Sequence, residues 1–307
     1  MARRQKISRI RNVHHPLPHR HGTSDYRSHR LQPAQGFPDE ELHFKTYRKA
    51  VKTLRGRELV IRTLDAGADK FHEEFVGFTE SNPFLGCRSI RLCLQKPDLF
   101  LSQVRAALRV SVFGPIKIML PMISTIEELR TAKEMIAKVR EELAAEGVEM
   151  APRVPVGIMV EVPSIALIID RVADEVDFFS IGTNDLVQYS LAVDRVNEHV
   201  AHLYQPSHPG ILRLIREVII TSNRADIPVS ICGEMCSEPA YILLLMGLGL
   251  RHFSLSPIAI PTVKRVIRQV TMKEAVKVAD ECLDSEQASE SEELLAKRVK
   301  KLLPDFF

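Results

Sequence analysis

The sequence predicts an α/β protein in which short parallel strands alternate with longer amphipathic helices. From residue 36 onward, short apolar runs alternate with stretches that repeat hydrophobic residues at helical spacing, a pattern typical of βα units. Several prolines stand near the starts of the expected helices, where a missing N–H is tolerated. Residues 36–270 are about as many as a (β/α)8 barrel needs, so we expect a (β/α)8 TIM-type barrel.

Six apolar runs are expected to be strands, because they have β-branched or aromatic centres and little polar alternation, as strands covered on both faces do. They are Leu59–Thr63, Ile116–Met122, Val156–Glu161, Val176–Gly182, Pro228–Cys232 and His252–Ser256. A seventh, short strand is expected at residues 85–90. The count is one short of eight, so the first strand is expected to be abnormal or missing, in the segment before Pro38.

Helical spacing predicts five helices between these strands and two after them. The first five are Asp98–Arg109, Thr125–Glu146, Ser164–Arg171, Ile211–Arg224 and Pro239–Gly247, and the last two are Lys273–Cys282 and Glu292–Leu303. We expect a barrel domain at residues 36–283 and a C-terminal helical tail at 284–307. Residues 1–35 carry eight Arg or Lys against one acid, without periodicity, and are expected to be a disordered or mistranslated leader.

The composition argues against several classes of protein. The apolar runs are too short to cross a bilayer, and the N-terminus has no apolar core of the kind a signal peptide needs. The five cysteines form no paired CxxC motifs and are expected to be reduced thiols. Nothing in the basic N-terminal segment predicts a reading helix or base-stacking residues. We therefore expect a cytoplasmic protein with neither a membrane nor a specific nucleic acid as partner.

Polar residues cluster at the carboxyl ends of the expected strands, where parallel α/β barrels build their sites. Arg62 stands near the end of one expected strand and Arg88 lies in the next, short one, as suits an anionic ligand. Glu161 and Asp185 end two others, and two carboxylates suit a hard cation such as Mg²⁺. Taken singly, Glu161 could instead cap the following helix, and Arg62 could only pair with Asp65. Their convergence favours a magnesium-assisted site for a small, highly anionic phosphate compound.

Three neighbouring motifs resemble the signature of enzymes that use phosphoenolpyruvate (PEP). They are Ser180–Tyr189 (SIGTNDLVQY), Leu191–Arg195 (LAVDR) and His202–Pro206 (HLYQP). Further matching segments are Val60–Asp65, Asn82–Gly86 with Arg88 and Arg91, Met159–Pro163, Cys232–Met235 and Phe253–Ser256. Together they resemble the C-terminal PEP-utilising barrel of phosphotransferase-system enzyme I, a phosphoenolpyruvate-protein phosphotransferase, over residues 36–282. The nitrogen-related type of this family is a plausible subtype.

This resemblance implies a role for each matching residue. Four side chains would meet the substrate together with Asp185, namely Arg62, Arg88, Asn184 and Arg195. Glu161 and Asp185 would hold Mg²⁺. Cys232 would protonate the enolate of pyruvate, and a thiol with a pKa near its reference value of about 8.5 is mostly protonated at neutral pH.

The resemblance also implies partners and leaves alternatives open. The phosphoryl group would pass to a histidine on a separate phosphohistidine domain, absent from this chain, and from there to a histidine-containing phosphocarrier protein in a sugar or nitrogen phosphotransferase system. A homodimer is expected. The family's first strand carries another phosphate arginine, for which this chain offers only Arg27, in an atypical context. The alternatives are a catalytically dead interaction module and a truncated relic of enzyme I.

Overall fold

The computed structural model describes residues 38–66, 80–302 and 304, which form two compact units. What we call the N-terminal unit comprises residues 38–66, 80–159 and 176–178 of the described chain. The C-terminal unit comprises residues 160–175, 179–302 and 304. The expected leader, residues 1–35, and the expected position of the first strand lie outside the described residues.

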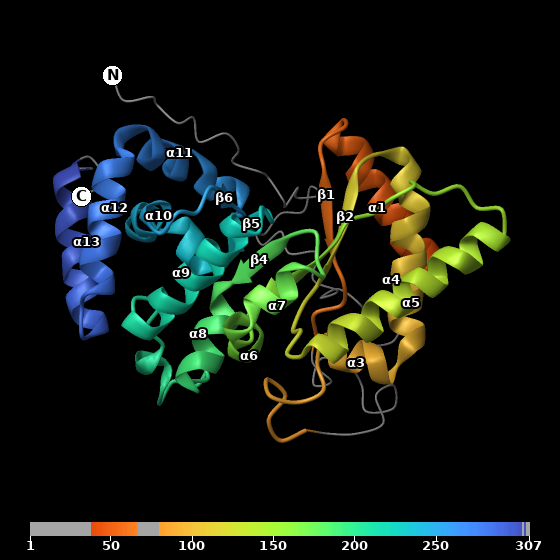
Figure 1. Ribbon diagram of the computed structural model, residues 1–307, viewed down its shortest axis with the longest axis horizontal. Coiled ribbons are helices and arrows are strands. Elements are labelled where there is room, and N and C mark those ends of the chain that lie inside the picture. The colour runs from red at the N-terminus through yellow and green to blue at the C-terminus, as the bar shows by residue number, and fades with distance from the viewer. Residues whose placement is uncertain (1–37, 67–79, 303, 305–307) are drawn as a thin grey trace. The chain divides into compact units, whose positions relative to one another are not determined.

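The N-terminal unit contains a parallel sheet whose strands all match expected ones (Figure 1). Strand β1 (Leu59–Arg62) pairs with β2 (Ile116–Leu120), with Leu59 opposite Ile116. Strand β2 pairs in turn with β3 (Val156–Val160), with Ile118 opposite Val156. The parallel direction follows from the helices that connect the strands, because a parallel pair needs a crossover connection.

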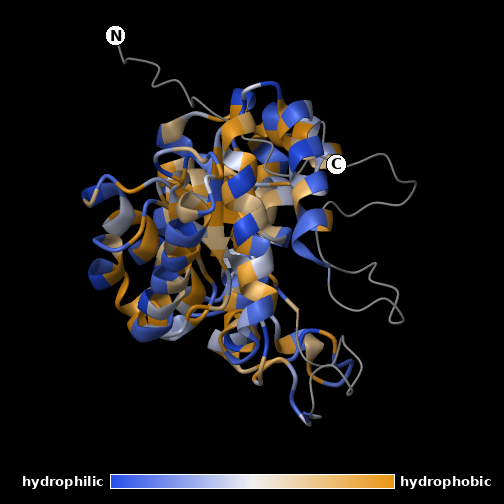
Figure 2. Ribbon diagram, turned by 90° about the vertical axis from the view of Figure 1, so that its right-hand side faces the viewer, coloured by the Kyte–Doolittle hydropathy of each residue, from blue (hydrophilic) through white to orange (hydrophobic). Residues whose placement is uncertain are grey.

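Four α-helices of the N-terminal unit are described. They are α1 (Glu40–Leu54), α3 (Ile90–Gln95), α4 (Pro97–Val110) and α5 (Ile126–Ala145), with the 3₁₀ turn η3 (Ser111–Phe113) after α4. Helix α5 begins with a capping box, in which Thr125 and Glu128 satisfy each other's free backbone N–H groups. Helices of this unit carry both hydrophilic and hydrophobic residues along their length (Figure 2), so that one face can pack on the unit's core.

Helix α1, which the sequence analysis did not predict, is anchored to α4 by charge. Its N-cap Asp39 accepts a hydrogen bond of 2.8 Å from the backbone N–H of Leu42. Arg105 and Arg109 of α4 pair with Glu40 in its first turn at 2.7 and 2.6 Å. An acid in the first turn of a helix also complements the helix dipole. These contacts keep the N-terminal end of α1 on α4.

The C-terminal unit contains the other three strands. Strand β4 (Phe179–Gly182) pairs in parallel with β5 (Val229–Cys232), which pairs with β6 (His252–Phe253). The unit's α-helices are α6 (Pro163–Leu167), α7 (Ile169–Ala173), α8 (Thr183–Leu191), α9 (Pro209–Arg224), α10 (Pro239–Gly247), α11 (Ile260–Gln269), α12 (Met272–Leu283) and α13 (Ala288–Leu302). Three 3₁₀ turns join them, η4 (Ala201–Leu203), η5 (Glu234–Ser237) and η6 (Pro257–Ala259).

Helix α10 is the most apolar helix of this unit, and its central residues are fully buried. It packs against α11, α12 and α13. A Cβ added at Gly247 would collide with the carbonyl of Ala275 in α12, so the glycine permits the close approach of these two helices. The two helices expected at the end of the chain are thus present as α12 and α13. In the described part of the chain, no helix is both long and apolar enough to span a membrane.

The predicted α/β class with parallel strands is confirmed, whereas the expected seventh strand at residues 85–90 is wrong. Residues 83–87 form turns, Arg88 makes a single β-bridge, and α3 begins at Ile90. Ser89 has a φ of 53°, which a strand does not allow. Its hydroxyl donates to Asp65 and its backbone N–H donates to Ala66, so tertiary contacts hold it in this conformation.

A buried histidine in α1 predicts that stability falls in mild acid. Burial lowers the pKa of His43 from 6.5 to about 4, with a smaller opposing effect from Asp39. The unfolded chain therefore binds a proton below pH 6.5 that the folded chain excludes. The free energy of unfolding should fall from pH 6.5 to about 4 by roughly 1.4 kcal/mol per pH unit from this group. Urea unfolding at several pH values measures the slope.

The variant His43→Gln should have a shallower slope in this pH range, because it has no group to titrate. His199→Gln is the matched control, since His199 is exposed. Identical slopes for the wild type and His43→Gln would contradict the prediction.

Candidate active site

Two predicted arginines of the N-terminal unit meet at one carboxylate. Arg62 is the last residue of β1, and its Nη1 lies 3.1 Å from Asp65 Oδ2. Nη2 of Arg88 lies 3.0 Å from Asp65 Oδ1. The Ser89 hydroxyl donates to the same oxygen. The pairing of Arg62 with Asp65, left open as an alternative by the sequence, is therefore present, and Arg88 joins it.

The charges around Asp65 keep it ionised. Burial alone would raise its pKa, but the positive charges of Arg62 and Arg88 and the hydrogen bonds from Ser89 and Arg88 hold the pKa below its ordinary value. The side chains of Arg62 and Arg88 are 21% and 10% exposed, so solvent screens the pairs only partly. Asp65 thus holds both arginines at the carboxyl end of β1.

Gln103 of α4 supports the backbone directly after Arg62, on both sides of Thr63, and does not belong to the motifs predicted from the sequence. Its Oε1 accepts a hydrogen bond of 2.8 Å from the N–H of Leu64. Its Nε2 donates to the carbonyl of Arg62 at 3.3 Å and to the hydroxyl of Tyr47 at 2.8 Å. No sequence motif predicts this role, because it depends on α4 packing beside β1.

In the C-terminal unit, β4 runs directly into α8. Strand β4 ends at Gly182 and α8 begins at Thr183, so Asn184 and Asp185 lie in the first helical turn. Asp185 is 7% exposed and pairs with Nη1 of Arg195 at 3.4 Å. The structure therefore brings together two of the predicted ligands at the carboxyl end of β4.

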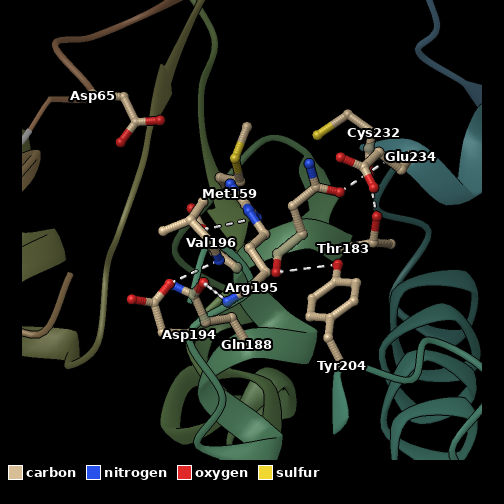
Figure 3. Close-up of polar contacts among 12 residues, drawn as sticks. Asp65, Met159, Thr183, Gln188, Asp194, Arg195, Val196, Tyr204, Cys232 and Glu234 are labelled. Carbon is tan, nitrogen blue, oxygen red and sulfur yellow. Dashed lines mark hydrogen bonds and ion pairs between the residues drawn. The ribbon is translucent and has the colours of Figure 1, made fainter. Parts of the chain in front are cut away.

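A side chain of α8 holds the loop that follows this helix and carries Arg195. Oε1 of Gln188 accepts a hydrogen bond of 3.2 Å from the backbone N–H of Arg195 (Figure 3). Within the described part of the chain, the Nε2 of Gln188 is buried and has no hydrogen-bond partner. Gln188 lies three residues after Asp185, on the same face of α8. The sequence analysis missed it, although this spacing within the motif could have indicated it.

Cys232 ends β5, directly opposite Gly182 of β4. Its thiol donates to the carbonyl of Ile181 at 3.5 Å, and the Ser180 hydroxyl donates to its sulfur at 3.8 Å. It is partly exposed, whereas the other four cysteines are buried. Burial raises the pKa of two others, Cys93 and Cys282, to about 12. Cys232 is therefore the thiol best placed to exchange a proton with a ligand.

The turn after Cys232 is tied to the first turn of α8 (Figure 3). The Thr183 hydroxyl donates to the carbonyl of Cys232 at 2.9 Å. The backbone N–H of Glu234 donates to Oδ1 of Asn184 at 3.0 Å. Between them, Gly233 has a φ of +105°, and a Cβ there would collide with the Thr183 hydroxyl and lie 2.7 Å from Oδ1 of Asn184. Only glycine fits this turn without strain.

Tyr204, from the third matching motif, also contacts this turn. Its hydroxyl donates to the carbonyl of Asn184 at 3.4 Å. Burial raises the pKa of Tyr204 to about 12, although the positive charge of Arg195 opposes the change. The phenol thus stays protonated at neutral pH and serves as a donor. The motif by itself predicts no role for Tyr204.

Glu161 follows β3 and is 2% exposed. It does not cap the next helix, since α6 has Val162 as its N-cap and no capping side-chain hydrogen bond. Among the described residues, no group of three or more His, Cys, Asp or Glu side chains forms a metal site. Mg²⁺ needs only one or two carboxylates, because water and substrate oxygens supply its other ligands. The oxygen donors of Glu161 and Asp185, both buried in the C-terminal unit, fit that requirement.

The predicted site residues fall into two groups, one in each unit. Arg62 and Arg88 meet at Asp65 in the N-terminal unit. The rest lie in the C-terminal unit, namely Glu161, Asn184, Asp185, Arg195 and Cys232. Within that unit, contacts join Asp185 to Arg195 and Asn184 to the turn after Cys232.

The polar side chains described above lie at the carboxyl ends of parallel strands. This is the place where α/β barrel proteins build their active sites. The profile of the family described as PEP-utilising enzyme, PEP-binding domain, matches residues 26–272. The chain therefore belongs to the PEP-utilising enzymes and represents their PEP-binding domain.

Curated relatives share this assignment. A phosphoenolpyruvate-protein phosphotransferase of Listeria monocytogenes is 45% identical over 261 residues, which cover 85% of this chain and 46% of the relative. One from Staphylococcus carnosus is 47% identical over 253 residues, covering 81% of this chain and 44% of the relative. The chain thus spans about half the length of the curated relatives it matches.

A solved structure supports the fold. The malate synthase of Haloferax volcanii, in a ternary complex with pyruvate and acetyl-CoA, superimposes with a TM-score of 0.50 at 12% identity. The match covers 74% of this chain and 56% of that chain. At this identity the likeness concerns the fold alone, and it confirms the predicted TIM-type class.

The Asp65 cluster predicts a stability change on neutralisation of one carboxylate. Asp65→Asn should lower the free energy of unfolding by about 3 kcal/mol at pH 7, because it leaves two partly buried arginines without their counter-ion. The pKa of Asp65 is lowered in the folded state, so its contribution is present above the unfolded value of about 3.9 and is lost below it. Urea unfolding at pH 7 and below pH 4 measures both effects.

The difference between wild type and Asp65→Asn should therefore shrink in acid. Glu141→Gln is the matched control, since Glu141 is an exposed acid of the same unit. A loss no larger than that of the control would contradict the prediction.

Proposed function

We propose that this chain is the PEP-binding half of a phosphoenolpyruvate-protein phosphotransferase, donating the phosphoryl group of PEP to a histidine on a separate domain. One observation carries the proposal. The Cys232 turn is hydrogen-bonded to the same first turn of α8 that bears Asn184 and Asp185. A proton donor and ligands for an anionic substrate are thus held by one structural element.

The cationic side chains suit the substrate's phosphate and carboxylate. Arg62, Arg88 and Arg195 are partly buried and already oriented by aspartates, so they lose little rotamer freedom on binding an anion. Among the buried polar atoms of the described chain that have no hydrogen-bond partner are Thr63 Oγ1 and Gln188 Nε2. Substrate oxygens would satisfy them, which would repay part of their burial cost.

Glu161 and Asp185 are the residues that would hold Mg²⁺. When bound, the cation would neutralise negative charge on the substrate as the phosphoryl group leaves. Arg195 lies beside Asp185, so its guanidinium would orient the substrate next to the cation's carboxylates.

Cys232 acts after the phosphoryl group has left. Its S–H proton passes to C3 of the pyruvate enolate, the electron pair of the C2–C3 double bond forms the new C–H bond, and the thiolate is reprotonated from water. The partial exposure of Cys232 supports this role, because both substrate and water must reach the sulfur.

The remaining parts of the proposal concern partners. We propose a cytoplasmic homodimer that serves a histidine-containing phosphocarrier protein in a sugar or nitrogen phosphotransferase system. The curated relatives are named phosphoenolpyruvate-protein phosphotransferase, which supports phosphotransferase activity in the proposal. A catalytically dead module is less well supported, because Glu161, Asp185, Arg62, Arg195 and Cys232 are all retained.

The metal assignment predicts that PEP binding depends on a divalent cation. Calorimetric titration should show PEP binding in Mg²⁺ and at least a roughly tenfold weaker interaction in excess chelator or in Glu161→Gln, because the cation's charge is lost. Glu134→Gln, a change in α5 of the other unit, should bind as the wild type does. Equal affinity in chelator would contradict the assignment of Mg²⁺.

The proposed division of labour predicts that this chain does not phosphorylate a carrier by itself. Phosphoryl transfer needs a nucleophile held in line with the leaving group, and no residue of the site described above supplies an imidazole. Labelled PEP should label the carrier only when a phosphohistidine domain is added in trans. That reaction should be weak, because the effective concentration of a tether is absent. Rapid carrier labelling without the added domain would contradict the proposal.

A further inference from the structure

We propose that Thr183 is a positioning residue for Cys232, acting together with the side chain of Asn184 to hold the thiol over the substrate's methylene carbon. This inference rests on the proposed function, since it explains how the proton donor of that reaction is kept in place. It gives Thr183 a role and gives the Asn184 side chain a second one besides substrate contact.

The register of β4 and β5 places Cys232 opposite the end of β4. Gly182 and Cys232 are paired residues of β4 and β5, so both strands end at the same level. The sulfur contacts the Ile181 carbonyl at 3.5 Å and the Ser180 hydroxyl at 3.8 Å, both on β4. The position of the thiol beside β4 thus depends on how the backbone of Cys232 is held.

Two hydrogen bonds hold the backbone that follows Cys232. Thr183 is fully buried, and its hydroxyl donates to the Cys232 carbonyl at 2.9 Å. Oδ1 of Asn184 accepts the N–H of Glu234 at 3.0 Å. The residue between the two held peptide groups is Gly233, whose φ of +105° reverses the chain at once. One hydrogen bond on each side of the glycine thus holds the backbone from which the Cys232 side chain projects.

These two hydrogen bonds also relate the proton donor to the substrate-binding residues of α8. Thr183, Asn184 and Asp185 are consecutive residues in the first turn of α8. The helix therefore positions both the proton donor, Cys232, and the substrate-binding residues. A displacement of a reacting group by about 1 Å can cost roughly 100-fold in rate. Holding the thiol from α8 therefore keeps its distance to the bound substrate constant.

The test uses proton exchange on pyruvate, which needs Cys232 but no phosphohistidine domain. In the reverse of the protonation step, the Cys232 thiolate removes a proton from C3 of pyruvate, the C–H pair forms the C2–C3 double bond and the carbonyl pair moves to oxygen. Return of a deuteron from D2O restores pyruvate with one methyl proton exchanged. Nuclear magnetic resonance follows the loss of the methyl signal in the presence of the chain and Mg²⁺.

Thr183→Val removes the hydroxyl and keeps the branched shape. It should lower the exchange rate by roughly 10- to 100-fold, since the thiol is displaced, while calorimetric PEP affinity stays that of the wild type. Thr183→Ser keeps the hydroxyl and should restore most of the rate. Thr221→Val, a hydroxyl-to-methyl change in α9 of the same unit, should have no effect. Exchange by Thr183→Val at the wild-type rate, or no rescue by serine, would overturn the inference.

Two further measurements cover the other outcomes. If Thr183→Val does not fold, Gly233→Ala decides, because its Cβ would collide with the Thr183 hydroxyl and displace the turn; exchange at the wild-type rate would overturn the inference. If the wild type neither binds PEP nor exchanges pyruvate, the proposed function fails. The alkylation rate of Cys232 by iodoacetamide, followed by mass spectrometry, should then still change in Thr183→Val but not in Thr221→Val, and equal rates would reject the positioning role.

Discussion

Pairing of charges at the ends of apolar strands is the constraint on which the rest of this structure depends. A charged group removed from water is tolerated only where an opposite charge or hydrogen bonds replace its hydration. Asp65 does this for Arg62 and Arg88 in the N-terminal unit, and Asp185 does it for Arg195 in the C-terminal unit. The strands can therefore be apolar along their length and still end in charged side chains.

The same pairing shapes the proposed chemistry. Guanidinium groups that are already held by aspartates lose less side-chain entropy when an anion binds. An incoming phosphate must, however, share Arg62 and Arg88 with Asp65, whose lowered pKa keeps its negative charge. The affinity for an anion at this cluster thus depends on how much charge the ligand brings. On the proposed function, the phosphate of PEP is such a ligand.

Local patterns predicted the strands well and some helices less well. The six strands of the described residues coincide with apolar runs, because a strand covered on both faces needs continuous hydrophobic residues. The helix expected at Ser164–Arg171 is divided into α6 and α7, since Ile168 has a φ of −113° and a ψ of 27°. Neither glycine nor proline marks this break. The strand expected at residues 85–90 is a turn because Ser89 is held on Asp65, a residue distant in sequence.

The sequence by itself determined the α/β class, the order of the strands along the chain, and which residue types stand at their ends, because these depend on hydrophobic periodicity and on motifs of consecutive residues. It also indicated the family. Only the tertiary structure decided that Arg88 reaches Asp65, that Gln103 supports the end of β1, and that Thr183 and Asn184 hold the turn after Cys232. The physical reason is that each of these contacts joins segments distant in sequence, and hydrogen bonds and ion pairs form only where the packing of strands and helices brings their atoms within about 3 Å.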